Sequence, residues 1–107
     1  MTIVPELLEG YSPIIASMAK PIGADKERRV RNLDEAFGSV LTDLRTGRRW
    51  TQQKLADMAG YDESYIRQLE RGTKSATLRT LADLASAFSL SVSVLIRRAE
   101  TRMQKHH

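Results

Sequence analysis

The chain has 107 residues, a formal net charge of +4 and no cysteine. This length predicts a single domain with tails, and the lack of cysteine excludes disulfide bonds and thiolate metal sites. The two histidines, His106 and His107, end the sequence and are typical of a tail or a purification-tag remnant rather than of a metal site. No apolar run approaches membrane-spanning length and no signal-peptide pattern opens the chain, so we expect a cytoplasmic protein without metal or cofactor.

The first 31 residues differ from those that follow. Three prolines interrupt this stretch, yet its leucines and isoleucines are too apolar to remain comfortably solvated. We expect short helices near residues 5–9 and 13–19, and we interpret 1–31 as an extension that covers a surface of its own domain, of a second copy or of another protein. The basic run at residues 26–31 predicts either a linker or the exposed start of the next helix.

Apolar residues recur at three- and four-residue steps from residue 33 onward, which is the spacing of helix faces. They predict an all-α domain of five helices over residues 32–98, followed by a basic tail over 99–107. Glycines at 47, 60 and 72 are expected to end the first three helices. The residues that we expect to cap helix starts are Asn32 or Asp34, Thr51, Asp62, Thr77 and Ser91.

Residues 51–72 form the most informative stretch, two short helices joined by a tight turn at Gly60. Ile66 and Leu69 lie three residues apart and predict the buried side of the second helix. Its opposite side is then polar, with Glu63, Ser64, Arg67, Gln68 and Arg71. A short helix of this kind can lie in a DNA major groove and offer hydrogen-bonding groups to base edges. Trp50, directly before this stretch, is expected to be a core anchor.

The net charge is unevenly distributed along the chain. Residues 33–96 carry eight acidic and eight basic residues, so the excess lies outside them. The inner basic residues nevertheless concentrate at 45–54 and 67–79, in and around the two-helix unit. Such a patch attracts phosphate, but lysine and arginine also simply keep helix surfaces soluble. Charge alone leaves both interpretations open.

From about Leu33 to Arg98 the chain resembles the lambda-repressor-like, Cro-type helix-turn-helix family of bacterial and phage regulators. The resemblance depends on several motifs in the right order, which are Thr51-Gln52-x-x-Leu55-Ala56, Gly60 in the turn, Ile66-x-x-Leu69-Glu70-Arg71-Gly72 and Leu78-x-x-Leu81-x-x-Leu84-Ala85. It implies a sequence-specific regulator, a repressor or a controller, that binds a near-palindromic site on double-stranded DNA through the major groove. It also implies a homodimer, with half-sites about one helical turn apart.

The resemblance further implies roles for individual residues of the two-helix unit. Base edges would be read by Ser64, Arg67, Gln68 and Glu63. For Glu63 two roles stay open, acceptance from a cytosine amino group or an ion pair with Arg67, and the ion pair is slightly favoured. Phosphate contacts are implied for Thr51, Gln52, Tyr65, Arg71, Lys74, Ser75, Thr77 and Arg45. Glu70 is expected to pair with Arg45 and so to tie the third helix of the domain to the first.

The same resemblance implies a dimer contact at the last helix and the loop before it. The residues expected there are Leu90, Val92, Val94, Leu95 and Arg98. Burial within the chain's own core is an equally open interpretation for Val92 and Leu95.

Two other functions stay open beside the regulator, while an enzyme is not expected. The chain has no Ser/His/Asp or Cys/His set and no glycine-rich phosphate loop. The alternative function is an antitoxin that binds DNA and holds a toxin through residues 1–31 or 99–107. A protein-interaction module that has lost DNA binding is a further alternative, and the acidic Glu63 on the outer helix side is its main support.

Overall fold

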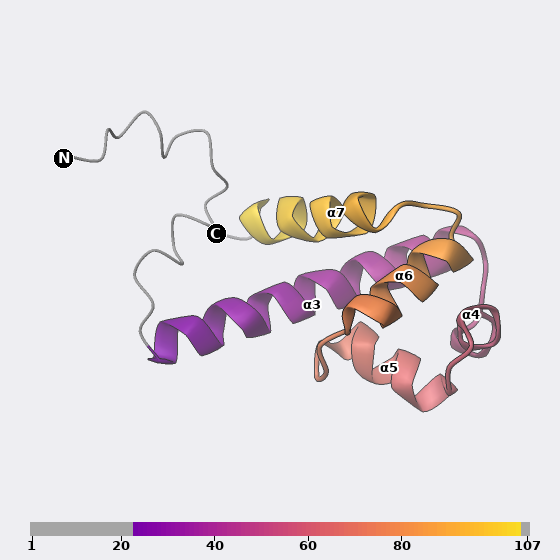
Figure 1. The fold of residues 1–107 in the computed structure, drawn as a ribbon, viewed down its shortest axis with the longest axis horizontal. Helices are drawn as coiled ribbons and strands as arrows, with labels where there is room; N and C mark the ends of the chain where they lie inside the picture. Colours follow the sequence, from indigo (N-terminus) through magenta and orange to yellow (C-terminus); the bar gives the residue numbers. More distant parts are fainter. Residues whose placement is uncertain (1–22, 106–107) are drawn as a thin grey trace. The chain divides into compact units, whose positions relative to one another are not determined.

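The structure, a computed structural model, describes residues 23–105, which form five α-helices (Figure 1). No strand occurs between these residues, so the predicted all-α class is confirmed. The helices expected near residues 5–9 and 13–19 lie outside the described part. The five helices are α3 (Gly23–Gly47), α4 (Gln52–Ala59), α5 (Glu63–Arg71), α6 (Leu78–Ala87) and α7 (Val92–Lys105).

The first of these helices starts earlier than predicted. α3 begins at Gly23, so the start expected at Asn32 or Asp34 is wrong. The basic run at 26–31 is therefore the exposed start of this helix, which is one of the two predicted interpretations, and not a linker. Its long charged side chains are good helix formers but face water without any apolar periodicity, which is why the pattern did not reveal them. By internal contacts the chain separates into residues 1–30 and 31–107, and the hydrophobic core lies in the second unit.

Most of the predicted helix boundaries are confirmed. The hydroxyl oxygens of Thr51, Thr77 and Ser91 each accept from the backbone N–H three residues further on, at 3.0, 3.1 and 3.3 Å. Gly60 and Gly72 end α4 and α5 with φ of 84° and 75°, a left-handed conformation that a side chain would disfavour. These caps fix where the short helices start and stop.

The cap expected at Asp62 is only half right. Asp62 does precede α5 in an extended conformation, but its exposed carboxylate makes no hydrogen bond to the helix amides. Its carbonyl oxygen accepts from the N–H groups of Tyr65 and Ile66 at 3.1 and 3.2 Å. The start of α5 therefore depends on backbone bonds rather than on a side-chain cap.

The core is built where α4, α5 and α6 meet α3 and α7. Its largest fully buried side chains come from all five helices or their ends, namely Leu41, Leu55, Ile66, Leu69, Leu84, Phe88 and Leu95. Trp50 stacks on Phe88 with ring centroids 5.4 Å apart, and the guanidinium of Arg48 lies 5.3 and 5.2 Å from the two ring centroids. Trp50 thus anchors the loop between α3 and α4 to the core, as predicted.

The basic tail expected over residues 99–107 is wrong for its described part. α7 continues through Lys105 instead, and Ala99 and Met103 are buried with exposed fractions of 0% and 8%. They follow Leu95 at four-residue steps and so extend its apolar side. In Figure 1 α7 runs beside α3, and Arg102 ties the two helices by donating to Asp43 and Ser39, both at 2.6 Å. The last helix is therefore part of the domain rather than a tail.

None of the helices described is, on its own, long and apolar enough to cross a membrane. The pair α6 and α7, which meet at 100°, passes that test together by length and composition alone. Several apolar residues of this pair, such as Leu84 and Leu95, are buried in the core, whereas Leu78 at the start of α6 is exposed.

Candidate nucleic-acid interface

α5 is buried along one side and polar along the other. Ile66 and Leu69 have no exposed surface and face the core, because residues three apart lie on the same side of a helix. The opposite side carries Ser64, which is exposed, and Arg67 and Gln68, which are half-buried. α5 therefore presents a short row of hydrogen-bonding groups that the described part of the chain leaves at the surface.

Glu63 and Arg67 form the ion pair that the sequence favoured. A nitrogen of the Arg67 guanidinium lies 2.6 Å from a carboxylate oxygen of Glu63, one helical turn earlier. About two fifths of each side chain remains exposed. The pair lowers the negative charge that Glu63 would present at this surface and holds the Arg67 side chain along the helix.

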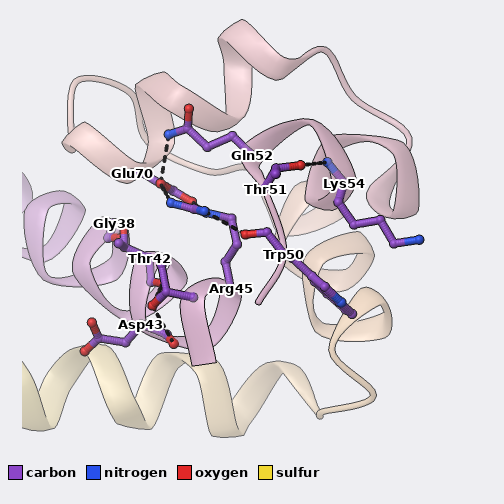
Figure 2. Close-up of polar contacts among 10 residues, drawn as sticks. Gly38, Thr42, Asp43, Arg45, Trp50, Thr51, Gln52, Lys54 and Glu70 are labelled. Carbon is purple, nitrogen blue, oxygen red and sulfur yellow. Dashed lines mark hydrogen bonds and ion pairs between the residues drawn. The ribbon is translucent and has the colours of Figure 1, made fainter. Parts of the chain in front are cut away.

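A network of polar side chains braces the end of α5 (Figure 2). The Glu70 carboxylate, only 5% exposed, accepts from Arg45 at 2.6 and 3.0 Å and from the Gln52 amide at 3.0 Å. The third nitrogen of Arg45 donates to the carbonyl oxygen of Trp50 at 2.8 Å. The predicted Glu70–Arg45 pair is confirmed, and with Gln52 it joins α5, α3 and the first residue of α4.

The same network engages Arg45, one of the residues expected to contact phosphate. Its side chain is 14% exposed, and each of its three nitrogens already donates to Glu70 or Trp50. If Arg45 left these bonds, the buried Glu70 carboxylate would lose its charged partner, which would lower the stability of the fold. Arg45 is a brace for α5, while Gln52 is half-buried at the exposed start of α4 and has a second amide hydrogen besides the one it gives to Glu70.

The remaining residues predicted to contact phosphate gather at two helix starts and the loop after α5. Thr51 is exposed beside Gln52 at the N-terminus of α4, and Thr77 is exposed at the N-terminus of α6. Helix N-termini carry free N–H groups and partial positive charge that favour anions. Lys74, Ser75 and Arg71 are exposed as well.

Two partners within this region were not foreseen. The Ser75 hydroxyl donates to the Asp34 carboxylate at 2.6 Å, across 41 residues of sequence. The Tyr65 hydroxyl lies 3.3 Å from that of Thr80, which is buried in the first turn of α6. Tyr65 is therefore anchored to α6 while its half-buried ring stays at the surface. Neither pairing has a local sequence signal, because both join residues far apart in the chain.

The turn between α4 and α5 is also tied to α6. The Tyr61 hydroxyl donates to the Asp83 carboxylate at 2.5 Å. This hydrogen bond raises the pKa of the Tyr61 phenol above its ordinary value, and burial and the Asp83 charge act in the same direction. The bond links the turn before α5 to α6.

The residues predicted at a dimer contact fall into two groups. Leu95 has no exposed surface and belongs to the core of its own chain, so its placement at a dimer contact is wrong. Leu90, Val92 and Val94 are half-buried, and Arg98 is exposed. These four remain available to a partner. Among the described residues no group of acidic or histidine side chains gathers to hold a metal ion.

Solved regulator structures share this arrangement. The clp gene regulator ClgR from Corynebacterium glutamicum is similar over 69% of this chain and 79% of its own, with a TM-score of 0.66 and 30% identity. The restriction-modification controller protein C.AhdI from Aeromonas hydrophila is similar over 58% of this chain and 94% of its own, with a TM-score of 0.56 and 34% identity. Both regulators therefore resemble this chain in fold as well as in sequence.

Sequence relatives are likewise transcriptional regulators rather than enzymes. The competence pilus inhibition repressor of Acinetobacter baylyi is 40% identical over 64 residues, which are 60% of this chain. The match spans 58% of that repressor's own length. The sequence model of the helix-turn-helix family HTH_3 matches residues 41–95, from the second half of α3 into α7. The chain therefore belongs to this helix-turn-helix family of transcriptional regulators.

Proposed function

We propose that this protein is a sequence-specific regulator that places α5 in the major groove of double-stranded DNA. The observation that carries the proposal is the division of α5 into a fully buried side, Ile66 and Leu69, and a polar side that residues 23–105 leave at the surface. A helix held in this way keeps its outer side chains at a fixed height above the domain surface. Such a helix is narrow enough for the major groove of B-DNA.

Base reading then falls to Arg67, Gln68 and Ser64. Arginine pairs well with the O6 and N7 atoms of guanine, and glutamine with the N6 and N7 atoms of adenine. Glu63, already paired with Arg67, would steer the guanidinium rather than read a base itself. We assign the phosphate contacts to Thr51, Gln52, Tyr65, Arg71, Lys74, Ser75 and Thr77, and we assign Arg45 to holding α5 through Glu70.

We further propose a homodimer on a near-palindromic operator, acting as a repressor or controller in the cytoplasm. Leu90, Val92 and Val94 supply a partly exposed apolar surface around the start of α7. The regulators named above support this class of function. The antitoxin alternative depends on residues 1–31 or 99–107, of which 1–22 and 106–107 lie outside the described part, and no contact described here favours it over the regulator.

Selection of bound duplexes from a random pool, repeated for variants, tests the proposal. Arg67→Ala should relax the preference at one base position and cost about 1–3 kcal/mol on the preferred site. Lys74→Ala should weaken all sequences alike and reduce the slope of log affinity against log salt by about one. Arg97→Ala, an exposed arginine on α7, is the control and should leave the selected sequence unchanged.

The contrast between the two variants decides the outcome. Phosphate contacts position a protein without reading sequence, whereas base contacts discriminate. A uniform loss from Arg67→Ala, with the base preference intact, would contradict the assignment of α5 as the reading helix.

A further inference from the structure

A groove of about 350 Å³ lies between α3 and α7. Pockets that hold small molecules have volumes of roughly 300–1,000 Å³, so this groove can take a small ligand. Its base is apolar, since Val40 is buried and Leu44 is half-buried, whereas most of its α7 side is polar and exposed. The residues that line it are Val40, Asp43, Leu44, Arg97, Arg98, Thr101 and Arg102.

The groove carries an excess of positive charge. Its one lining carboxylate, Asp43, is paired with Arg102 at 2.6 Å. Across the residues that the structure describes, neither Arg97 nor Arg98 has an ion-pair partner. The groove therefore presents two exposed guanidinium groups beside an apolar surface.

The arginines of the groove belong to a part of α7 beyond the family match. That match ends at residue 95, and Arg97, Arg98 and Arg102 all follow it. The α7 side of the groove is formed entirely by these later residues. The groove therefore depends on how this chain continues α7, not on the DNA-facing helices.

We propose that the groove between α3 and α7 binds a small amphipathic anion. Its carboxylate or phosphate would accept from Arg97 and Arg98, because guanidinium groups pair with both anions in a forked geometry. Its apolar body would lie against Leu44 and Val40. An anion of this kind gains both contacts, whereas a cation of the same shape would meet like charge. The site would give the regulator a small-molecule input separate from α5.

Titration of the full chain with octanoate, followed by two-dimensional NMR of its backbone amides, tests the site without DNA. With octanoate, saturable shifts are expected at residues 40–44 and 97–102. Octyl phosphate should shift the same residues. Octylammonium should shift neither segment. Arg97→Gln and Arg98→Gln should each weaken binding about tenfold, the effect of losing a charge-assisted hydrogen bond. Arg79→Gln, which removes the same charge from the exposed surface of α6, should leave the affinity unchanged.

Three results would overturn the inference. Shifts that fail to saturate or scatter over the whole surface would show a general attraction to detergent-like ions. Equal binding of octylammonium would show that the arginines play no part. If Arg98→Gln instead abolishes self-association and octanoate does not bind, the groove is a contact between two copies. All of these readouts use DNA-free protein, so they leave the proposed DNA binding untouched.

Discussion

At the scale of single residues, Gly38 shows how closely α3 approaches the end of α5. A Cβ atom added at Gly38 would lie 2.4 Å from the carbonyl oxygens of both Leu69 and Glu70. Those oxygens belong to backbone that ends a short helix next to the Glu70 brace, so they cannot move aside without disturbing the brace. The helix contact therefore requires a residue without a side chain.

We predict that Gly38→Ala lowers the free energy of unfolding by about 1–3 kcal/mol or more, as overpacking of a buried contact does. Gly47→Ala is the matched control, because no atom lies within 4 Å of an added Cβ at that helix end. Alanine is the better helix former, so Gly47→Ala should be neutral or slightly stabilising. Urea unfolding measures both, and equal effects of the two substitutions would contradict the close contact.

The Tyr61–Asp83 hydrogen bond predicts a measurable titration. The bond raises the pKa of Tyr61, so its contribution to stability is fully present below pH about 10 and is lost as pH rises through the folded-state pKa. Asp83→Asn should lower the pKa of Tyr61 toward its ordinary value, since the negative acceptor is gone. NMR of ¹³C-labelled tyrosine rings follows the ionisation. Asp57→Asn, exposed on α4, is the control, and an unchanged Tyr61 pKa in Asp83→Asn would contradict the cause.

At the scale of the helices, boundaries with a chemical signal were predictable and those without one were not. The threonine and serine caps, and the glycines after α4 and α5, are enough to locate the short helices from the sequence alone. The start of α3 has no such signal, because charged residues form exposed helix without any periodic pattern. The end of α7 was missed for a different reason, since small Ala99 and a single Met103 among arginines give only a weak apolar face.

The brace at the end of α5 predicts a large difference between two glutamates of the same helix. Glu70→Ala should lower the free energy of unfolding by about 3–5 kcal/mol, because it leaves the mostly buried Arg45 without its partner. Glu63→Ala breaks a half-exposed pair and should cost only about 0–1 kcal/mol. Thermal and urea unfolding of both variants measure the difference. Similar losses would mean that the Glu70 network does not hold α5.

At the scale of the whole molecule, sequence reasoning identified α5 as a helix with one buried and one polar side, but not the contacts that hold it in the domain. The buried and polar sides of α5 follow from local spacing. The bond from Arg45 to Trp50, the Ser75–Asp34 bond and the burial of Leu95 follow from how the chain folds back on itself. A family resemblance assigns roles to residues by their place in the sequence, whereas the folded structure shows which hydrogen-bond donors already have partners.

The dimer proposal makes the final prediction, which concerns how two copies share one operator. Val94→Glu places a charge on the partly exposed apolar surface of α7, so the variant should sediment as a monomer. Its affinity for a single half-site should be unchanged, because α5 is intact, while its affinity for the palindrome should fall to nearly that of the half-site. Ser86→Glu, exposed on α6, is the control for added charge and should remain dimeric. A Val94→Glu protein that still dimerises would place the contact elsewhere, whereas equal losses on half-site and palindrome would mean that the substitution damages the DNA-binding domain itself.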